Sequence, residues 1–305
     1  MTAMLHFLIL LGFPPLLPGI IQRVKALIAG RTGPPLLQAY FDLSKLLRKG
    51  AVYSRTTTWV FRSGPIVSLA SVLAAGLVLP LGVGPAPLGF PGDVIFFAYV
   101  LALGRFFTMI AALDTGSSFE GMGASREAAF SALAEPAFLL ALAIICVPAR
   151  SVSFANVWSA LPWSTWGIGH PALLAAAAVL FAVLLAENSR IPVDDPATHL
   201  ELTMIHEVMV LDHGGPDLAF ILYGSSIKLF LFGGILTYLL LPIPQQGGMP
   251  GLTLFLAGEV GVAVLVGLVE SAMARLRLPR VPQFLIGVGA LAVIGLALFL
   301  YRGQP

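Results

Sequence analysis

Long apolar stretches alternate with short polar ones along the whole chain. Eight of the apolar stretches could form membrane-spanning helices, because about 20 such residues cross the ~30 Å hydrocarbon layer. The expected spans cover approximately residues 3–22, 64–83, 92–113, 129–149, 171–187, 218–241, 252–272 and 284–301. The first contains Pro14, Pro15 and Pro18, so we expect it to be kinked or partly unwound. The pattern predicts an all-α, multi-pass membrane protein with one membrane domain over residues 1–305.

The loops between these spans predict the orientation of the chain. Thirteen Lys and Arg residues fall in one alternate set of loops, and Arg150 alone falls in the other set. The basic set comprises residues 23–63, 114–128, 188–217 and 273–283. By the positive-inside rule these loops face the cytoplasm and both termini face outward. The multi-pass pattern and this asymmetry predict a chain embedded in a membrane, with its basic loops on the cytoplasmic side.

Composition supports a membrane protein and restricts its chemistry. The chain is 58% hydrophobic and 10% charged, whereas a soluble domain carries about 25% charged residues. A single cysteine, Cys146, cannot form an internal disulfide or hold an iron–sulfur cluster or zinc ribbon. Phosphate-binding, nucleophile-elbow and nucleic-acid motifs are also absent from the sequence.

Two of the expected cytoplasmic loops carry most of the polar residues. The basic loop, 23–63, has eight Lys or Arg residues and one acid, Asp42, so it could attract anionic lipid or dock an acidic protein face. The acidic loop, 188–217, belongs to a polar block, 186–217, that holds seven of the 15 carboxylates. Carboxylates concentrated at a membrane surface are the first candidates for function.

Within the acidic loop we expect a turn at Pro192 and Pro196 and then a short amphipathic helix over about Thr198–Leu211. Leu200, Met204 and Val208 would form its apolar stripe. A solvated surface helix is the simpler alternative. Three histidines recur every seven residues, but the zinc pattern HExxH fails because Val210 follows His206-Glu207 at the second histidine position. We therefore expect these histidines to be structural or proton-handling and predict no metal site.

Several ionisable residues fall inside the expected spans. They are Arg105, Glu135, Lys228, Glu259 and Glu270. A charge at the bilayer centre costs about 2.5–3.5 kcal/mol on insertion scales, so such groups are kept facing the bundle interior, paired or near water. They could load and release protons, or they could form static ion pairs. Glu270, near the cytoplasmic end, could instead be solvated.

Four groups of residues form motifs that can be compared with known families. They are Arg31–Pro34 with Leu37-Gln38 and Asp42–Lys45, Ala124–Glu127 with Glu135-Pro136, Ala186 to Leu202, and Glu270–Arg277. Together they resemble one family, the membrane subunit called subunit 1 in respiratory complex I (NADH-quinone oxidoreductase). The chain is most similar to its hydrogenase-type branch, the membrane subunits of formate hydrogenlyase and membrane-bound nickel–iron hydrogenases. Val193, Ala197 and His199 replace a phenylalanine and two glutamates of the complex I motif, which argues against quinone reduction.

The resemblance implies a membrane anchor and coupling subunit of an energy-converting redox complex in the plasma (inner) membrane of a prokaryote. Its partners would be an iron–sulfur small subunit and a hydrogenase-like large subunit on the cytoplasmic side, with antiporter-like subunits in the membrane. Iron–sulfur clusters and nickel–iron would lie in the partner chains, with no cofactor and no catalytic residue in this one. The alternatives are a solitary secondary transporter, a purely structural anchor, and a complex I-type subunit that contributes to a quinone site.

The intramembrane charges, the acidic loop and the resemblance together give two sets of candidate residues. In the family, acids in the third-loop and fifth-span motifs form a charged path into the membrane, with arginines as counter-charges. The ion-translocation and coupling candidates are Glu135, Glu187, Asp194, Glu201, Glu207, Arg105, Lys228 and Glu259. The partner-docking candidates are Arg31, Gln38, Asp42, Lys45, Arg126 and Arg190, of which Arg126 and Arg190 would also be the counter-charges.

Overall fold

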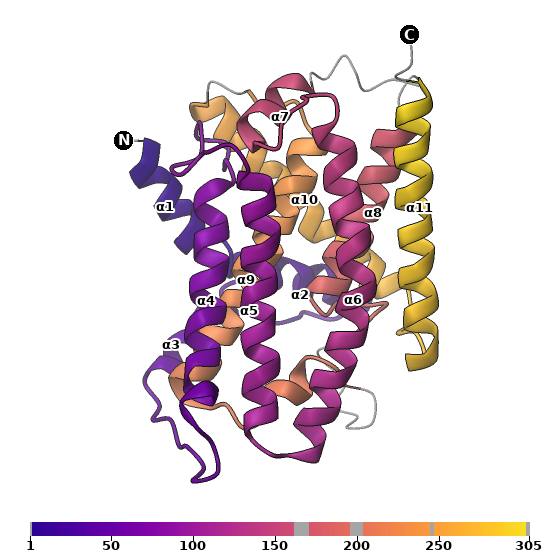
Figure 1. Ribbon diagram of the computed structural model, residues 1–305. Coiled ribbons are helices and arrows are strands. Elements are labelled where there is room, and N and C mark those ends of the chain that lie inside the picture. The colour runs from indigo at the N-terminus through magenta and orange to yellow at the C-terminus, as the bar shows by residue number, and fades with distance from the viewer. Residues whose placement is uncertain (1, 162–170, 196–203, 245–246, 303–305) are drawn as a thin grey trace.

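The computed structural model describes residues 2–161, 171–195, 204–244 and 247–302, and within them it is helical with no strand. The first part of the chain forms α1 (Thr2–Gly12), α2 (Leu16–Ile28), α3 (Gln38–Leu47), α4 (Trp59–Val78), α5 (Asp93–Asp114) and α6 (Ser118–Cys146). The remainder forms α7 (Phe154–Ala160), α8 (Pro171–Glu187), η2 (Glu207–Val210), α9 (Gly215–Leu240), α10 (Met249–Ala272), η3 (Leu278–Arg280) and α11 (Val281–Arg302). Figure 1 shows the long helices running side by side, with both chain ends at the same end of the bundle.

Among the residues that the structure describes, six helical stretches are long and apolar enough to cross a membrane. They are α4, α5, α6, α9, α10 and the segment Leu278–Tyr301. The pair α1 and α2 forms a seventh if it counts as one span, and α8 is apolar but has only 17 residues. A multi-pass, all-helical chain is thus confirmed for the described residues, whereas the count of eight spans and the sides of the termini remain predictions.

The first expected span is broken, as its prolines predicted. α1 and α2 are bent by 45° at the break that contains Pro14 and Pro15. Proline lacks the amide proton that a continuous helix needs, and the residue before it avoids the helical region. α2 consequently leaves the direction of α1 and packs against α10.

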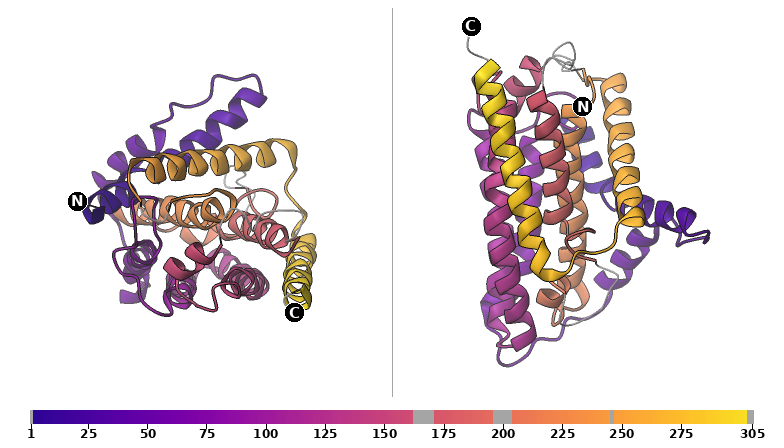
Figure 2. Two further views of the ribbon diagram at one scale, coloured as in Figure 1. Left: turned by 90° about the horizontal axis from the view of Figure 1, so that it is seen from above. Right: turned by 90° about the vertical axis from the view of Figure 1, so that its right-hand side faces the viewer.

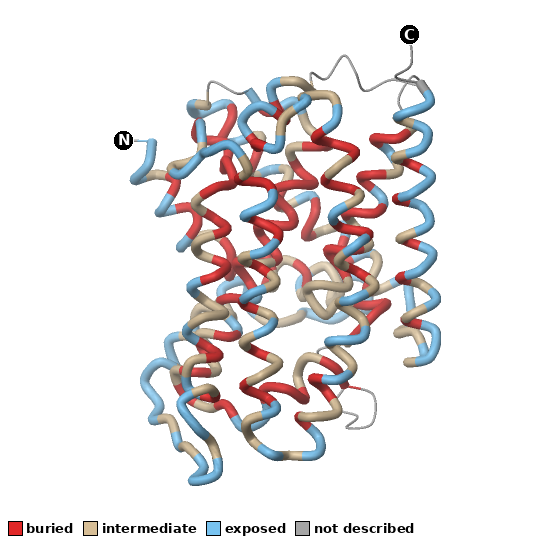
Figure 3. The backbone as a smooth tube through the Cα atoms, in the orientation of Figure 1, coloured by how far each residue is buried: buried red, intermediate tan, exposed pale blue. Residues whose placement is uncertain are grey.

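The bundle is built around α9. In its most apolar stretch 67% of the residues are buried, against 22% in the stretch that contains α11. α4 and α5 pack together, α4 also contacts α9, and α11 packs against α6 and α8. Figure 2 shows α11 at one corner of the bundle and the indigo-to-purple region of α2 and α3 projecting from another side, and Figure 3 shows buried positions concentrated toward the interior.

Two expected loops contain more helix than the hydropathy pattern predicted. α6 begins at Ser118 rather than near residue 129, so most of the expected loop 114–128 is the first three turns of a helix. The basic loop 23–63 contains the end of α2, all of α3 and the start of α4. Polar residues extended these helices beyond the apolar stretch, which hydropathy alone does not reveal.

The expected amphipathic helix over Thr198–Leu211 is not found in its described part. Residues 204–206 are not helical, and only the short 3₁₀ helix η2 follows them. The side chain of Asp194 accepts a hydrogen bond from the backbone N–H of His206 at 3.3 Å, which ties the start of this segment to the turn after α8. Residues 198–203, with Leu200, lie outside the described part of the chain, while Met204 and Val208 are buried as expected.

Candidate functional site

Glu187 is the last residue of α8 and the centre of a buried charge cluster. Its carboxylate accepts hydrogen bonds from the Arg105 guanidinium and from the Lys228 ammonium, the latter at 2.7 Å. Lys228 also donates to the backbone carbonyl of Glu187 at 2.7 Å. The final carbonyls of a helix lack intrahelical partners and attract cations. The three side chains therefore join α5, α8 and α9 at the end of α8.

The same arginine extends the cluster toward the side of the bundle. Arg105 lies 3.3 Å from the carboxylate of Glu135 on α6. The Glu135 side chain is 38% exposed, whereas the side chains of Arg105 and Glu187 are each 10% exposed. Glu135 thus has a cationic partner on the inside and an open face on the outside. The two acids and two bases of this cluster balance in charge.

Glu127 adds a third carboxyl that the sequence analysis did not select. It lies on α6 two turns before Glu135 and interacts electrostatically with Arg105, Glu187 and Lys228. Glu127 lines the same cavity as Arg105, Glu187 and Lys228, so three carboxyl groups, those of Glu127, Glu135 and Glu187, lie near two cations. The available signal was the spacing of eight residues between Glu127 and Glu135, which places both on related faces of one helix.

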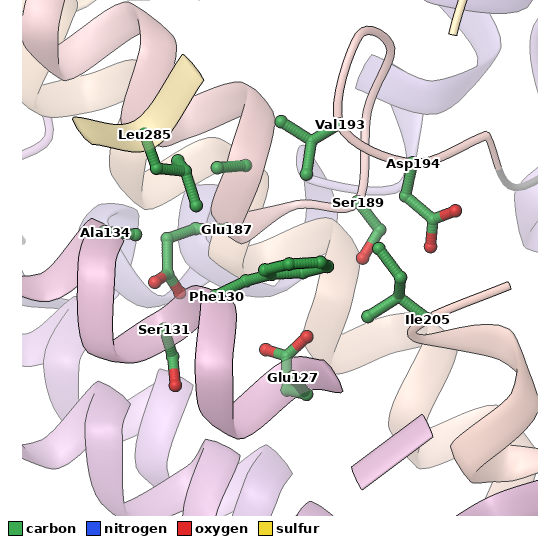
Figure 4. A pocket seen from close by; sticks show the side chains of 11 residues that line it. Glu127, Phe130, Ser131, Ala134, Glu187, Ser189, Val193, Asp194, Ile205 and Leu285 are labelled. Carbon is green, nitrogen blue, oxygen red and sulfur yellow. The ribbon is translucent and has the colours of Figure 1, made fainter. Parts of the chain in front are cut away.

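Glu127, Glu187 and Asp194 also line a small pocket together with Phe130 and Ile205 (Figure 4). The three carboxyl groups come from α6, from the end of α8 and from the turn that follows it. The structure thus brings the predicted residues Glu187 and Asp194 together. Residue Glu201, the third acid expected at this mouth, lies outside the described residues.

Asp194 is held by several partners despite its burial. It forms an ion pair with Arg275 at 2.9 Å and accepts hydrogen bonds from the N–H groups of Asp195 and His206. Burial raises the pKa of Asp194, and Arg275 and these hydrogen bonds oppose that rise. Burial, helped by the Lys228 ammonium, lowers the pKa of His206 to about 4, although Glu187 acts in the opposite direction. His206 is therefore neutral near pH 7.

A larger cavity of about 320 Å³ runs from α3 to the charge cluster. Asp42 lines it at the α3 side, and Arg105, Glu187 and Lys228 line it at the other. The remaining acidic lining residues are Glu127, Asp194 and Glu207. One cavity therefore connects a docking candidate with most of the coupling candidates.

Four of the six docking candidates, Gln38, Asp42, Lys45 and Arg31, lie at two places. On α3, the Gln38 amide donates to Asp42 at 2.9 Å, and Lys45 is exposed at the end of the same helix. Arg31 is exposed and lines an open groove between α2 and α10 that also contains Lys25. Docking at these two places remains a prediction.

The two expected counter-charges of the path, Arg190 and Arg126, contact a carboxylate and a backbone carbonyl. Arg190 lies 3.4 Å from Glu270, and Lys25 lies 2.7 Å from the same carboxylate. The Glu270 side chain is fully buried rather than solvated, because these two cations enclose it. Arg126 donates to the backbone carbonyl of Met204 at 2.8 Å. The cations beside Glu135 and Glu187 are instead Arg105 and Lys228.

Glu259 lies apart from the cluster. It is 1% exposed, and its carboxyl group accepts a hydrogen bond from the Thr237 hydroxyl at 3.4 Å. Among the described residues, no group of three or more His, Cys, Asp or Glu side chains could hold a metal ion.

Known proteins match this chain over almost its whole length. The family described as NADH dehydrogenase matches residues 1–301. Formate hydrogenlyase subunit 4 of Escherichia coli (strain K12) is 32% identical over 302 residues, covering 96% of this chain and 97% of the relative. Hydrogenase-4 component C of the same strain is 31% identical and covers 90% of this chain and 87% of its own length.

The fold also occurs in a solved assembly. A chain in the structure of the membrane-bound sulfane sulfur reductase (MBS), an archaeal respiratory membrane complex, superimposes with a TM-score of 0.84. It is 23% identical, and the match covers 98% of each chain. This likeness supports the fold, and the two sequence relatives support the hydrogenase-type branch. The chain belongs to the NADH dehydrogenase family and is a membrane subunit of the complex I-related hydrogenase group.

Proposed function

We propose that this chain anchors a peripheral oxidoreductase arm in a prokaryotic plasma membrane and couples electron transfer to proton or sodium translocation. The arm would dock on the cytoplasmic side through α3 and the Arg31 region. Iron–sulfur and hydrogenase-like subunits would carry the redox centres, and antiporter-like subunits would pack beside this chain in the membrane. The names of the two sequence relatives support an assembly of this kind.

The observation that carries the coupling proposal is that the carboxyl groups around two buried cations outnumber those cations by one. Glu127, Glu135 and Glu187 face Arg105 and Lys228 at the end of a cavity that reaches α3. A new charge in the docked arm would shift the proton affinities of the whole interacting group, because coupled sites titrate together. A proton taken from the cavity could then pass toward Glu135, whose outer face is open.

A charge-balanced pair of substitutions tests this role. In the intact complex, replacing Glu187 by Gln and Lys228 by Met together removes one acid and one base from the cluster. We expect the complex to assemble and to reduce an artificial dye, while the ions moved per electron fall strongly. Glu135→Gln should give the same loss with a smaller effect on folding, since that side chain is partly exposed.

Asp212→Asn is the matched control, because Asp212 lies in the same acidic segment with an exposed side chain. It should leave ion movement unchanged. Full coupling in both cluster variants would reduce the chain to an anchor and would refute the coupling role. A chain that purifies alone and transports a solute in liposomes would instead support the secondary transporter.

The cavity gives one reason to keep a quinone site as a second candidate, since a volume of about 320 Å³ could admit a quinone ring. The loss of two motif acids argues against quinone reduction. Binding of a short-chain quinone to the purified complex would support a quinone site, and its failure to bind would exclude one.

A further inference from the structure

Glu259 is a buried acid without a cationic partner among the described residues. It lies in the middle of α10 and is 1% exposed. The hydroxyl of Thr237 on α9 approaches its Oε1 atom at 3.4 Å. Its Oε2 atom is buried and has no hydrogen-bond partner in the described part of the chain. This environment contrasts with that of Glu187, which has two cations within hydrogen-bond distance.

The neighbouring helix leaves room for the carboxyl group. A Cβ atom at Gly233 would lie 2.6 Å from Oε2 and 3.2 Å from Oε1 of Glu259, closer than side chains pack. Gly233 is one turn before Thr237 on α9. Gly233 thus leaves space for the carboxyl group of Glu259, and Thr237, one turn further along α9, provides a hydroxyl that contacts it.

The packed helices present no charge to this site within the described ranges. α10 packs against α2 and α9. On α2, Lys25 pairs with Glu270, eleven residues further along α10, and Arg23 donates to the backbone carbonyl of Thr32. On α9, Lys228 pairs with Glu187. Lys228 precedes Thr237 by nine residues, which is about 13 Å along the helix. The titratable Tyr238 accepts from the N–H of Gly82.

These surroundings fit a protonated carboxyl group. A buried carboxylate without a cation is strongly disfavoured, whereas the neutral acid needs only ordinary hydrogen bonding. A hydroxyl can donate to a carboxylate and can accept from a carboxylic acid. The Thr237 contact can therefore persist in both protonation states, which an ammonium or guanidinium partner would not allow.

We propose that Glu259 is a second proton-binding site, which holds a proton in the resting protein and exchanges it during turnover. The exchange during turnover rests on the proposed coupling function. The site lies about two and a half helical turns along α9 from the Lys228–Glu187 pair. Thr237 is its hydrogen-bond partner, and the absence of a side chain at Gly233 leaves space for the carboxyl group.

Infrared difference spectroscopy on the purified intact complex tests the proposal. We expect resting wild type at neutral pH to show a carboxylic-acid C=O band that is absent from Glu259→Gln. Thr237→Val should shift this band, because the hydroxyl contact is lost while the acid remains. The band should lose intensity when the complex is reduced and turns over, and Glu259→Gln should lower the ions moved per electron.

Two results would overturn the proposal. The absence of an acid band assignable to Glu259 would mean that the group is ionised at rest. A band of constant intensity during turnover would mean that its proton is structural. If Glu259→Gln fails to assemble, the Thr237→Val shift still assigns the band. The double variant Glu187→Gln with Lys228→Met distinguishes failure of the proposed function from failure of this proposal. Unchanged coupling in that variant would refute the role of the charge cluster. The acid band of Glu259 in the resting complex does not depend on that outcome.

Discussion

Lys228 binds Glu187 twice, with its Nζ atom 2.7 Å from the side-chain carboxylate and 2.7 Å from the backbone carbonyl of the same residue. One ammonium group therefore neutralises an acid and closes the end of α8. Arg105 holds the other carboxylate oxygen. The end of α8 is fixed by two helices that approach it from different sides, which gives the cluster a defined geometry.

This arrangement makes the charges strongly interdependent. Glu187→Gln should destabilise the chain by about 3–5 kcal/mol, because it leaves Arg105 and Lys228 buried without their shared acid. Adding Lys228→Met should recover part of this loss. Unfolding in detergent of the two single variants and the double variant measures the interaction. Additive losses would show that the two residues do not stabilise each other.

Acidification should weaken the segment around His206. Its pKa is lowered to about 4 in the folded chain, below the unfolded value of about 6.5. Between these values the unfolded chain binds more protons, so this contribution to stability is complete above about pH 6.5 and is lost as the pH falls toward 4. His206→Gln should flatten stability against pH over that range. An identical pH profile in wild type and variant would contradict the shift.

Gly123 should be required for the close packing of η2 against α6. A Cβ atom there would overlap a methyl group of Val208 and would lie 3.0 Å from the carbonyl oxygen of Ile205. Gly123→Ala should therefore displace residues 204–210 and speed their amide hydrogen exchange. Gly121→Ala is the control, because a Cβ atom there meets only Leu113, at 3.9 Å. Equal exchange in both variants would show that the close contact is relieved elsewhere.

Asp114 should stabilise the start of α4. Its carboxylate accepts hydrogen bonds from the N–H of Thr58 at 2.6 Å, the Thr58 hydroxyl at 2.9 Å and the N–H of Phe61 at 3.2 Å. The first N–H groups of a helix lack internal partners, and losing a cap costs about 1 kcal/mol. Asp114→Ala should lower the free energy of unfolding by about that amount, and Asp114→Asn by less. No change in either variant would mean that water replaces the cap fully.

The hydropathy pattern predicted the class of fold because apolar runs of this length have few alternatives. It located α5, α8 and α10 closely, since their polar ends coincide with the helix ends. It missed the first three turns of α6, where Glu120, Arg126 and Glu127 interrupt the apolar pattern. Those residues continue the helix because their polar side chains face the η2 segment or the cavity rather than lipid.

The members of the charge cluster were easier to predict than the way they pair. Arg105, Glu135 and Lys228 were selected as charges in apolar surroundings, which is a local property of the sequence, and Glu187 was selected from the polar block 186–217 and the family motif. Which cation meets which acid depends on how α5, α8 and α9 rotate against one another, and that is decided by packing. The pairing of Glu270 with Lys25, 245 positions away in the chain, had no local signal at all.

The short length of α8 has a further consequence for the proposed energy conversion. With 17 residues it measures about 25 Å, whereas the 29 residues of α6 measure about 43 Å. Glu187 therefore lies partway along the length of α6, at the inner end of the cavity that reaches α3. The membrane voltage would fall mainly across the remaining apolar thickness, where moving one charge through 100 mV is worth about 2.3 kcal/mol. Glu259 lies in the middle of α10, so under the proposed function a proton arriving there would sense an electric field that a proton at Glu187 has not yet met.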